Sequence, residues 1–190
     1  MRAAGVLAAV VAIAVAAGAG TAIATQVDRL ATETPGGVRN APVELGAPER
    51  VTIPAIGVDA RIVPVGLTAD GAMQTPDFGL AAWYRPGPRP GDTGPAVLLA
   101  HVDSRAHGPD VFARLHELKS GDQITVHYHD AATTFAVTAT EQTAKTALPR
   151  EKIWRATNKP VLRLITCGGP YDRGAGGYLD NVIVYADRLV

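Results

Sequence analysis

Short apolar runs separated by glycine, proline and aspartate constrain the fold of this chain more than any other feature. Within most runs apolar and polar residues alternate, which is the pattern of strands rather than helices. One run, AVLLA before His101, is continuously apolar, as expected for a strand buried on both faces. The runs cover residues 51–58, 60–67, 96–101, 123–129, 133–140, 161–166 and 181–185. The pattern predicts a mostly antiparallel β-barrel or curled sheet.

Only one segment of the folded region, residues 110–118, has helical spacing. Val111, Leu115 and Leu118 fall on one face, and Pro109 stands at its start. We therefore predict a single short helix there.

The N-terminal stretch, residues 1–25, predicts a membrane segment. Residues 3–25 follow Arg2, carry no charge and are almost entirely small or apolar. An uncharged stretch of roughly 20 residues can cross a bilayer as a helix, and the positive charge before it favours a cytoplasmic N-terminus. A cleaved signal peptide is the alternative, since residues 22–24 form a small-x-small pattern. Both interpretations place the rest of the chain outside the cytoplasm.

The remaining sequence divides into a linker and a domain. Residues 26–49 contain several prolines and glycines and no apolar period, which is typical of a flexible extracytoplasmic linker. Residues 50–190, roughly 140 residues, have a common size for a single domain. The 18 basic and 18 acidic side chains balance to a net charge of zero. This balance gives no reason to expect nucleic-acid binding.

Cys167 is the only cysteine, so no disulfide can form within the chain. In an oxidising compartment an unpaired thiol is either buried and inert or used as a reactive thiolate. Gly168, Gly169 and Pro170 follow it, and we expect them to end its strand at the sulfur. A thiol at a strand end is accessible.

His101 ends one apolar run just as Cys167 ends another. An imidazole beside a thiol favours the thiolate and can donate a proton to a leaving amine. The spacing alone does not show that the two residues meet, and a histidine satisfied by a backbone group is the alternative. The other histidines offer no convincing spacing for zinc, so no metal is expected.

Five segments of the domain form a recognisable set: IPAIGVDA (53–60), VGL (65–67), AHVDS (100–104), LITCGG (164–169) and DNVIVY (180–185). In sequence and in order they resemble the motifs of sortases, and they are most similar to those of the class F sortases of actinobacteria. The resemblance implies an eight-stranded sortase-type β-barrel with short helices, preceded by an N-terminal membrane helix. It also implies a single-pass membrane protein with an extracytoplasmic catalytic domain over residues 50–190 and no cofactor.

The activity implied by the resemblance is that of a cysteine transpeptidase. The thiolate of Cys167 would attack the Thr–Gly amide of an LPXTG-like sorting signal on a secreted protein and form a thioester. An amine on a cell-wall precursor would then resolve the thioester. His101 would act as general acid in the first step and as general base in the second.

The third catalytic residue departs from the family's pattern. Class F sortases typically place an arginine in a YRDN run, where it steadies the substrate carbonyl, but residues 178–181 here read YLDN. Leu179 cannot donate a hydrogen bond. Arg173, six residues after the cysteine, is the nearest replacement. Arg163 shares a strand face with the cysteine but lies four residues before it, roughly 13 Å along a strand.

Two other functions remain open at this point. One is another cysteine hydrolase or transpeptidase of the envelope, although L,D-transpeptidases usually carry their histidine shortly before the cysteine, whereas His101 lies far before Cys167 in this sequence. The other is a catalytically weakened, anchored sortase-like barrel, which the missing arginine favours.

Overall fold

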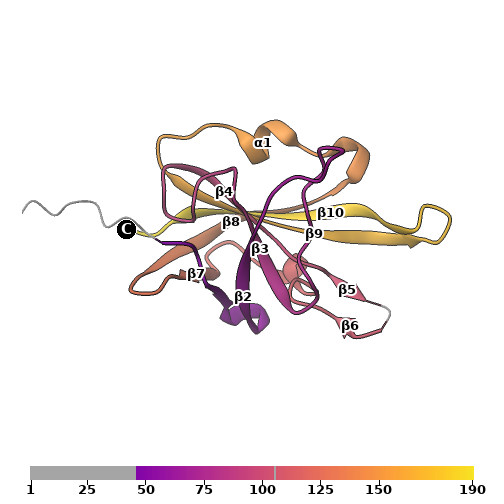
Figure 1. The fold of residues 1–190 in the computed structure, drawn as a ribbon, viewed down its shortest axis with the longest axis horizontal. Coiled ribbons are helices and arrows are strands. Elements are labelled where there is room, and N and C mark those ends of the chain that lie inside the picture. Colours follow the sequence, from indigo (N-terminus) through magenta and orange to yellow (C-terminus); the bar gives the residue numbers. More distant parts are fainter. Residues whose placement is uncertain (1–45, 105) are drawn as a thin grey trace, which may run out of the picture. The chain divides into compact units, whose positions relative to one another are not determined.

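Eight strands close into a barrel in the computed structural model, which describes residues 46–104 and 106–190 (Figure 1). Around the barrel their order is β1-β2-β3-β4-β9-β10-β8-β7. Their bounds are β1 Arg50–Ile53, β2 Val58–Val65, β3 Leu80–Tyr84, β4 Gly94–Leu99, β7 Gln123–His127, β8 Ala132–Ala144, β9 Pro160–Asp172 and β10 Gly177–Arg188. The predicted eight-stranded barrel is confirmed, whereas the predicted membrane helix lies outside the described residues.

Most neighbouring strands are antiparallel, as the alternating runs predicted. Two pairs are parallel, β2 with β3 and β4 with β9. The strands β5 (Asp103–Ser104) and β6 (Gly108–Pro109) form a separate two-stranded sheet after β4. The parallel pair of β4 and β9 matters most for the site, because the histidine follows one strand and the cysteine lies on the other.

The first strand ends earlier than predicted. The expected strand over residues 51–58 is broken after Ile53 by a 3-10 turn at Pro54–Ile56. Pro54 has no N–H to donate to a ladder, and Gly57 reverses the chain with a φ of 69°. β2 therefore begins at Val58, which pairs with Ile53.

The predicted helix over residues 110–118 is wrong. The segment forms successive turns, in which some backbone N–H groups donate to the carbonyl three residues before them, such as Ala113 to Asp110 and Leu115 to Phe112. It ends in a 3-10 turn at Leu115–Glu117. Its apolar spacing reflects burial instead, since Phe112, Leu115 and Leu118 are all buried in the barrel core. The Phe112 N–H also donates to the His101 carbonyl at 3.0 Å, so this segment is held against the residues after β4.

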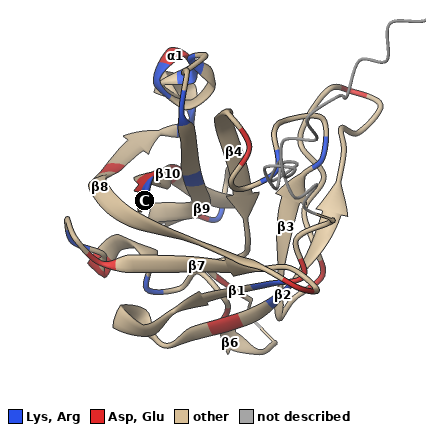
Figure 2. Ribbon diagram, turned by 90° about the vertical axis from the view of Figure 1, so that its left-hand side faces the viewer, with Lys and Arg blue, Asp and Glu red and all other residues tan. Residues whose placement is uncertain are grey.

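Side chains of β9 alternate between the two faces of the sheet. Leu162 and Leu164 belong to the barrel core, whereas Ile165 packs against a smaller outer cluster of Val97, Ile153 and Ile183. The helix α1 (Arg150–Trp154) contributes Ile153 to this outer cluster, and its basic residues are visible in Figure 2. Since side chains alternate with a period of two, Cys167 shares the outward face of Ile165.

Candidate active site

The strand that carries Cys167 does not end at the sulfur, contrary to the prediction. β9 continues to Asp172 and pairs with β10 as a long hairpin, which extends beyond the rest of the barrel in Figure 1. The glycines form a bulge instead of a break: Gly168 pairs with Asp180 and Tyr171 with Tyr178, so two residues of β9 oppose one of β10. Gly169 adopts a φ of 73° within this bulge. The thiol is half-buried on the outer face of a continuing strand.

The parallel ladder of β4 and β9 sets the position of the histidine. Its pairs run from Gly94 with Pro160 to Leu99 with Ile165, and the offset in residue number is the same in every pair (160 − 94 = 165 − 99). That offset also separates His101 from Cys167 (167 − 101). Neighbouring strands lie about 4.8 Å apart, so extending this register past Leu99 brings the histidine beside the cysteine.

Two further hydrogen bonds continue this register past the end of β4. The Ala100 N–H donates to the Ile165 carbonyl at 3.4 Å, and the buried Thr166 hydroxyl donates to the Ala100 carbonyl at 2.8 Å. Ala100 and Thr166 immediately precede the histidine and the cysteine. The two segments are therefore held together directly before the two residues of interest.

The His101 ring is fixed from two sides. Its Nε2 lies 2.9 Å from the Pro76 carbonyl oxygen, and the Phe78 ring stacks on it with centroids 4.4 Å apart. A carbonyl oxygen can only accept, so Nε2 carries a proton in this arrangement. Nδ1 is consequently the ring nitrogen that remains for proton exchange.

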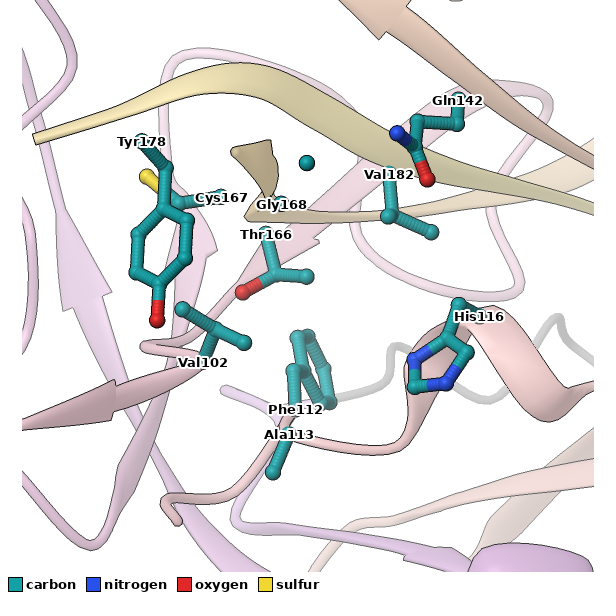
Figure 3. A pocket seen from close by; sticks show the side chains of 11 residues that line it. Val102, Phe112, Ala113, His116, Gln142, Thr166, Cys167, Gly168, Tyr178 and Val182 are labelled. Atoms are coloured by element: carbon teal, nitrogen blue, oxygen red, sulfur yellow. The ribbon is translucent and has the colours of Figure 1, made fainter. Parts of the chain in front are cut away.

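Cys167 lines two cavities. The larger one, about 500 Å³, is also lined by His101 and Arg173. The smaller one, about 260 Å³, reaches from the cysteine to His116 on the segment before β7 (Figure 3). Val102 and Tyr178 line both cavities together with the cysteine. The larger cavity therefore holds all three residues that the sequence singled out.

The arginines differ in their relation to the cysteine. Arg173 is exposed in the turn between β9 and β10 and lines the larger cavity. Arg163 is buried, and its guanidinium lies 4.8 Å from the centre of the Tyr185 ring. It lines a separate cavity. Burial lowers the pKa of its guanidinium. Leu179, where the resemblance to class F sortases led us to expect an arginine, is 41% exposed and lines neither cavity of the cysteine.

Sequence reasoning gave no role to three side chains next to the site. Tyr178 donates a hydrogen bond of 2.5 Å to Asp103 Oδ2, and this bond, with partial burial, raises the pKa of Tyr178 to about 12. Tyr178 and Asp103 are two of these side chains, and the third is Phe78, which lies in an irregular loop. Asp103 lies within a motif segment and Tyr178 lies just before another, so the motifs could have pointed to both residues. The loop around Phe78 has no apolar periodicity, so nothing in the sequence pointed to this residue.

Neither a metal site nor a membrane span is found in the part of the chain that the structure describes. Within residues 46–104 and 106–190, no group of three His, Cys, Asp or Glu side chains is arranged to hold a metal ion. No helix in the same residues is both long and apolar enough to cross a membrane.

A closed β-barrel with a cysteine and a histidine in one cavity is an arrangement suited to a cysteine hydrolase or transpeptidase. The family model of the sortase domain matches residues 51–189, and the chain therefore belongs to the sortase family. It is a sortase, an enzyme of the cysteine transpeptidase type. Members of this family act at the cell envelope on proteins that carry sorting signals.

Solved structures of sortases share this fold. Sortase A from Corynebacterium diphtheriae, a lid mutant, is 20% identical with a TM-score of 0.60 and coverage of 78% of this chain and 73% of that one. Group B Streptococcus Pilus Island 1 Sortase C2 is 23% identical with a TM-score of 0.57 and coverage of 75% and 73%. Sortase C-1 from Actinomyces oris is 19% identical with a TM-score of 0.56 and coverage of 74% and 73%. No curated protein matched the sequence.

Proposed function

We propose that this sortase cleaves an LPXTG-like sorting signal between Thr and Gly and transfers the protein to an amine of a cell-wall precursor. In this proposal Cys167 is the nucleophile, His101 is the general acid and base, and Arg173 stabilises the attacked carbonyl. The five motif segments favour a class F enzyme.

One observation carries the assignment of residues. The constant offset of the β4–β9 ladder equals the separation of His101 and Cys167 in the sequence, and both residues line the same cavity of about 500 Å³. The half-buried thiol on β9 and the half-buried imidazole just after the adjacent strand β4 can exchange a proton once substrate closes the cavity over them.

In the first step the Cys167 thiolate attacks the carbonyl carbon of the Thr residue of the sorting signal. The C–N bond of the Thr–Gly amide breaks, and the imidazolium of His101 gives its Nδ1 proton to the leaving amine. The Nε2–H keeps its bond to the Pro76 carbonyl throughout, so the ring retains its orientation. The product is a thioester between the cysteine and the N-terminal part of the substrate.

In the second step an acceptor amine attacks the thioester carbonyl. Nδ1 of the now neutral His101 takes a proton from this amine, the C–S bond breaks, and the thiolate is restored. An amide to the acceptor replaces the amide that was cleaved. The two steps together therefore consume no external energy and need no cofactor.

Arg173 is the proposed donor to the oxygen of the attacked carbonyl. It is a cationic side chain on the wall of the larger cavity, whereas Leu179 carries no donor at the usual position of the family. A guanidinium presents several N–H donors in a planar fork, which suits a developing oxyanion.

We further propose that residues 1–25 anchor the enzyme as a single-pass membrane protein and that residues 26–49 are the tether of an extracytoplasmic catalytic domain over residues 50–190. The uncharged stretch after Arg2 and the proline- and glycine-containing stretch that follows support this division.

Product analysis tests the reaction. The enzyme is incubated with a peptide that contains an LPXTG sequence and with an amine acceptor, and the products are identified by mass spectrometry. We expect cleavage between Thr and Gly, with the N-terminal product joined to the amine. Cleavage at another bond, or no cleavage of any sorting-signal variant by a folded enzyme, would contradict the proposal.

A further inference from the structure

A tyrosine hydroxyl connects the segments that carry the proposed nucleophile and the proposed acid and base. Tyr178, near the start of β10, donates its hydrogen bond of 2.5 Å to Asp103. Asp103 lies just after His101 in the sequence, whereas Tyr178 belongs to the same hairpin as Cys167. The bond therefore joins the histidine segment to the cysteine hairpin.

This connection lies where the backbone ladder has ended. β4 stops at Leu99, and the last links toward β9 are those of Ala100 with Ile165 and Thr166. After Ala100, one hydrogen bond joins residues 101–104 to the hairpin of β9 and β10. It is the bond between Tyr178 and Asp103, and no other is found among the described residues. Pro76, Phe78 and Phe112 also hold His101, but this bond is the one that ties its segment directly to the hairpin of the cysteine.

The tyrosine side chain lines the same cavities as the thiol, and Figure 3 shows Tyr178 and Cys167 among the residues around the smaller one. Its ring packs edge-on against Tyr171, with centroids 5.3 Å apart. Because the bond to Asp103, with partial burial, raises the pKa of Tyr178 to about 12, the hydroxyl remains a donor at every pH at which such an enzyme would be assayed.

We propose that Tyr178 is a positioning residue that, through its hydrogen bond to Asp103, holds the His101 segment against Cys167 for proton transfer. It exchanges no proton with substrate itself. A displacement of about 1 Å at a reacting group can cost on the order of 10²-fold in rate, so a single tether of this kind has a measurable effect. The inference rests on the proposed function, because that function assigns the proton transfer to His101.

The test uses Tyr178→Phe, Asp103→Ala and the double variant in the full chain. Two readouts are followed: kcat/KM for a sorting-signal peptide, and the rate at which iodoacetamide alkylates Cys167 as a function of pH. Each single variant is expected to lower kcat/KM about tenfold or more and to move the alkylation profile to higher pH, because the imidazole no longer supports the thiolate. The double variant is expected to match the single ones, since both remove the same bond.

A matched control is available on the same strand. Tyr185 also donates to a carboxylate, Glu141 Oε2 at 3.1 Å, but it packs with the outer cluster away from the cysteine. Tyr185→Phe should leave the alkylation profile and kcat/KM unchanged. If it matched Tyr178→Phe, the effect would be a general loss of hairpin stability and the proposal would be overturned.

The direction in which Asp103→Ala moves the alkylation profile distinguishes a positioning role of Asp103 from a direct effect of its negative charge on the thiol. Removing a carboxylate near the thiol would by itself favour the thiolate and move the alkylation profile to lower pH. An opposite sign for Asp103→Ala and Tyr178→Phe would overturn the proposal, as would a Tyr178→Phe enzyme within about twofold of wild type in both readouts. Alkylation requires no turnover, so these outcomes are distinct from failure of the proposed function, which cleavage by a Cys167→Ala enzyme would reveal.

Discussion

Cys167 combines exposure toward a cavity with a position outside the barrel core. The thiol is half-buried on the outward face of β9, while the core of that strand is formed by Leu162 and Leu164. Cys167→Ala should therefore abolish peptide cleavage, by about 10³-fold or more, and shift the melting temperature by only about 2 °C. Cleavage followed by chromatography and a thermal melt of the same preparation check both statements. A folded variant that still cleaves the peptide would show that another group is the nucleophile.

Arg173 is the proposed replacement for the arginine that the resemblance to class F sortases would place at Leu179. If its guanidinium binds the attacked carbonyl, Arg173→Ala should lower kcat by on the order of 10² to 10³ without an appreciable change in melting temperature, because the side chain is exposed. Arg150→Ala, at another exposed arginine on α1, is the control. An Arg173→Ala enzyme within a few-fold of wild type would reject the role. A simultaneous gain in Leu179→Arg would then show that the family's usual arginine position is merely vacant.

At the scale of the elements, the bulge in β9 shapes the hairpin beyond the cysteine. Gly169 has a φ of 73°, and a Cβ there would overlap the Asp180 carboxylate, which itself accepts a hydrogen bond from Gln142 at 2.8 Å. Gly169→Ala should lower the free energy of unfolding by about 1–3 kcal/mol from the backbone conformation alone and by more once the overlap is included.

Gly176→Ala is the matched control for this prediction. Gly176 lies in the turn of the same hairpin with a φ of 71°, but a Cβ there would meet nothing within 4 Å. Urea unfolding of the two variants should therefore show a larger loss for Gly169→Ala. Equal losses would mean that the contact with Asp180 has no energetic weight.

These elements also show what the sequence could predict. Short apolar runs identified seven of the eight barrel strands: β4 was marked by a continuous apolar run, and the others by alternation, because side chains on a strand must face core and exterior in turn. Neither pattern marked the short strand β3, and the glycines after Cys167 suggested a strand end when the chain instead forms a bulge. The spacing of residues 110–118 signalled burial but not the hydrogen-bond pattern, which is fixed by tertiary contacts such as that between Phe112 and His101.

The candidate site was predictable in its residues but not in its geometry. The lone cysteine and the histidine at a strand end were visible, yet only the register of β4 with β9 relates them. Register between strands so far apart in the sequence depends on the whole barrel, and no local pattern encodes it. The bond between Tyr178 and Asp103 could not be predicted for the same reason, since its partners are also far apart along the chain.

For the whole molecule, the barrel holds all of the proposed chemistry. The backbone of Glu49 already belongs to the ladder, because its N–H donates to His127 at 2.9 Å and its carbonyl accepts from Ile62 at 2.8 Å. A fragment that begins at Gly46 keeps these bonds and should fold and cleave a sorting-signal peptide with the kcat/KM of the full chain. Circular dichroism and a cleavage assay check this prediction. A folded but inactive fragment would mean that residues 1–45 take part in the chemistry.

The most direct measurement of the central claim is the intact mass of the enzyme during turnover. When the enzyme is mixed with an LPXTG-containing peptide and no acceptor amine, we predict an adduct whose mass equals the N-terminal part of the peptide through Thr, located at Cys167 by peptide mapping. Addition of an amine should discharge it, and Cys167→Ala should never form it. Cleavage of the peptide without an adduct, or an adduct on another residue, would contradict a thioester mechanism at this cysteine.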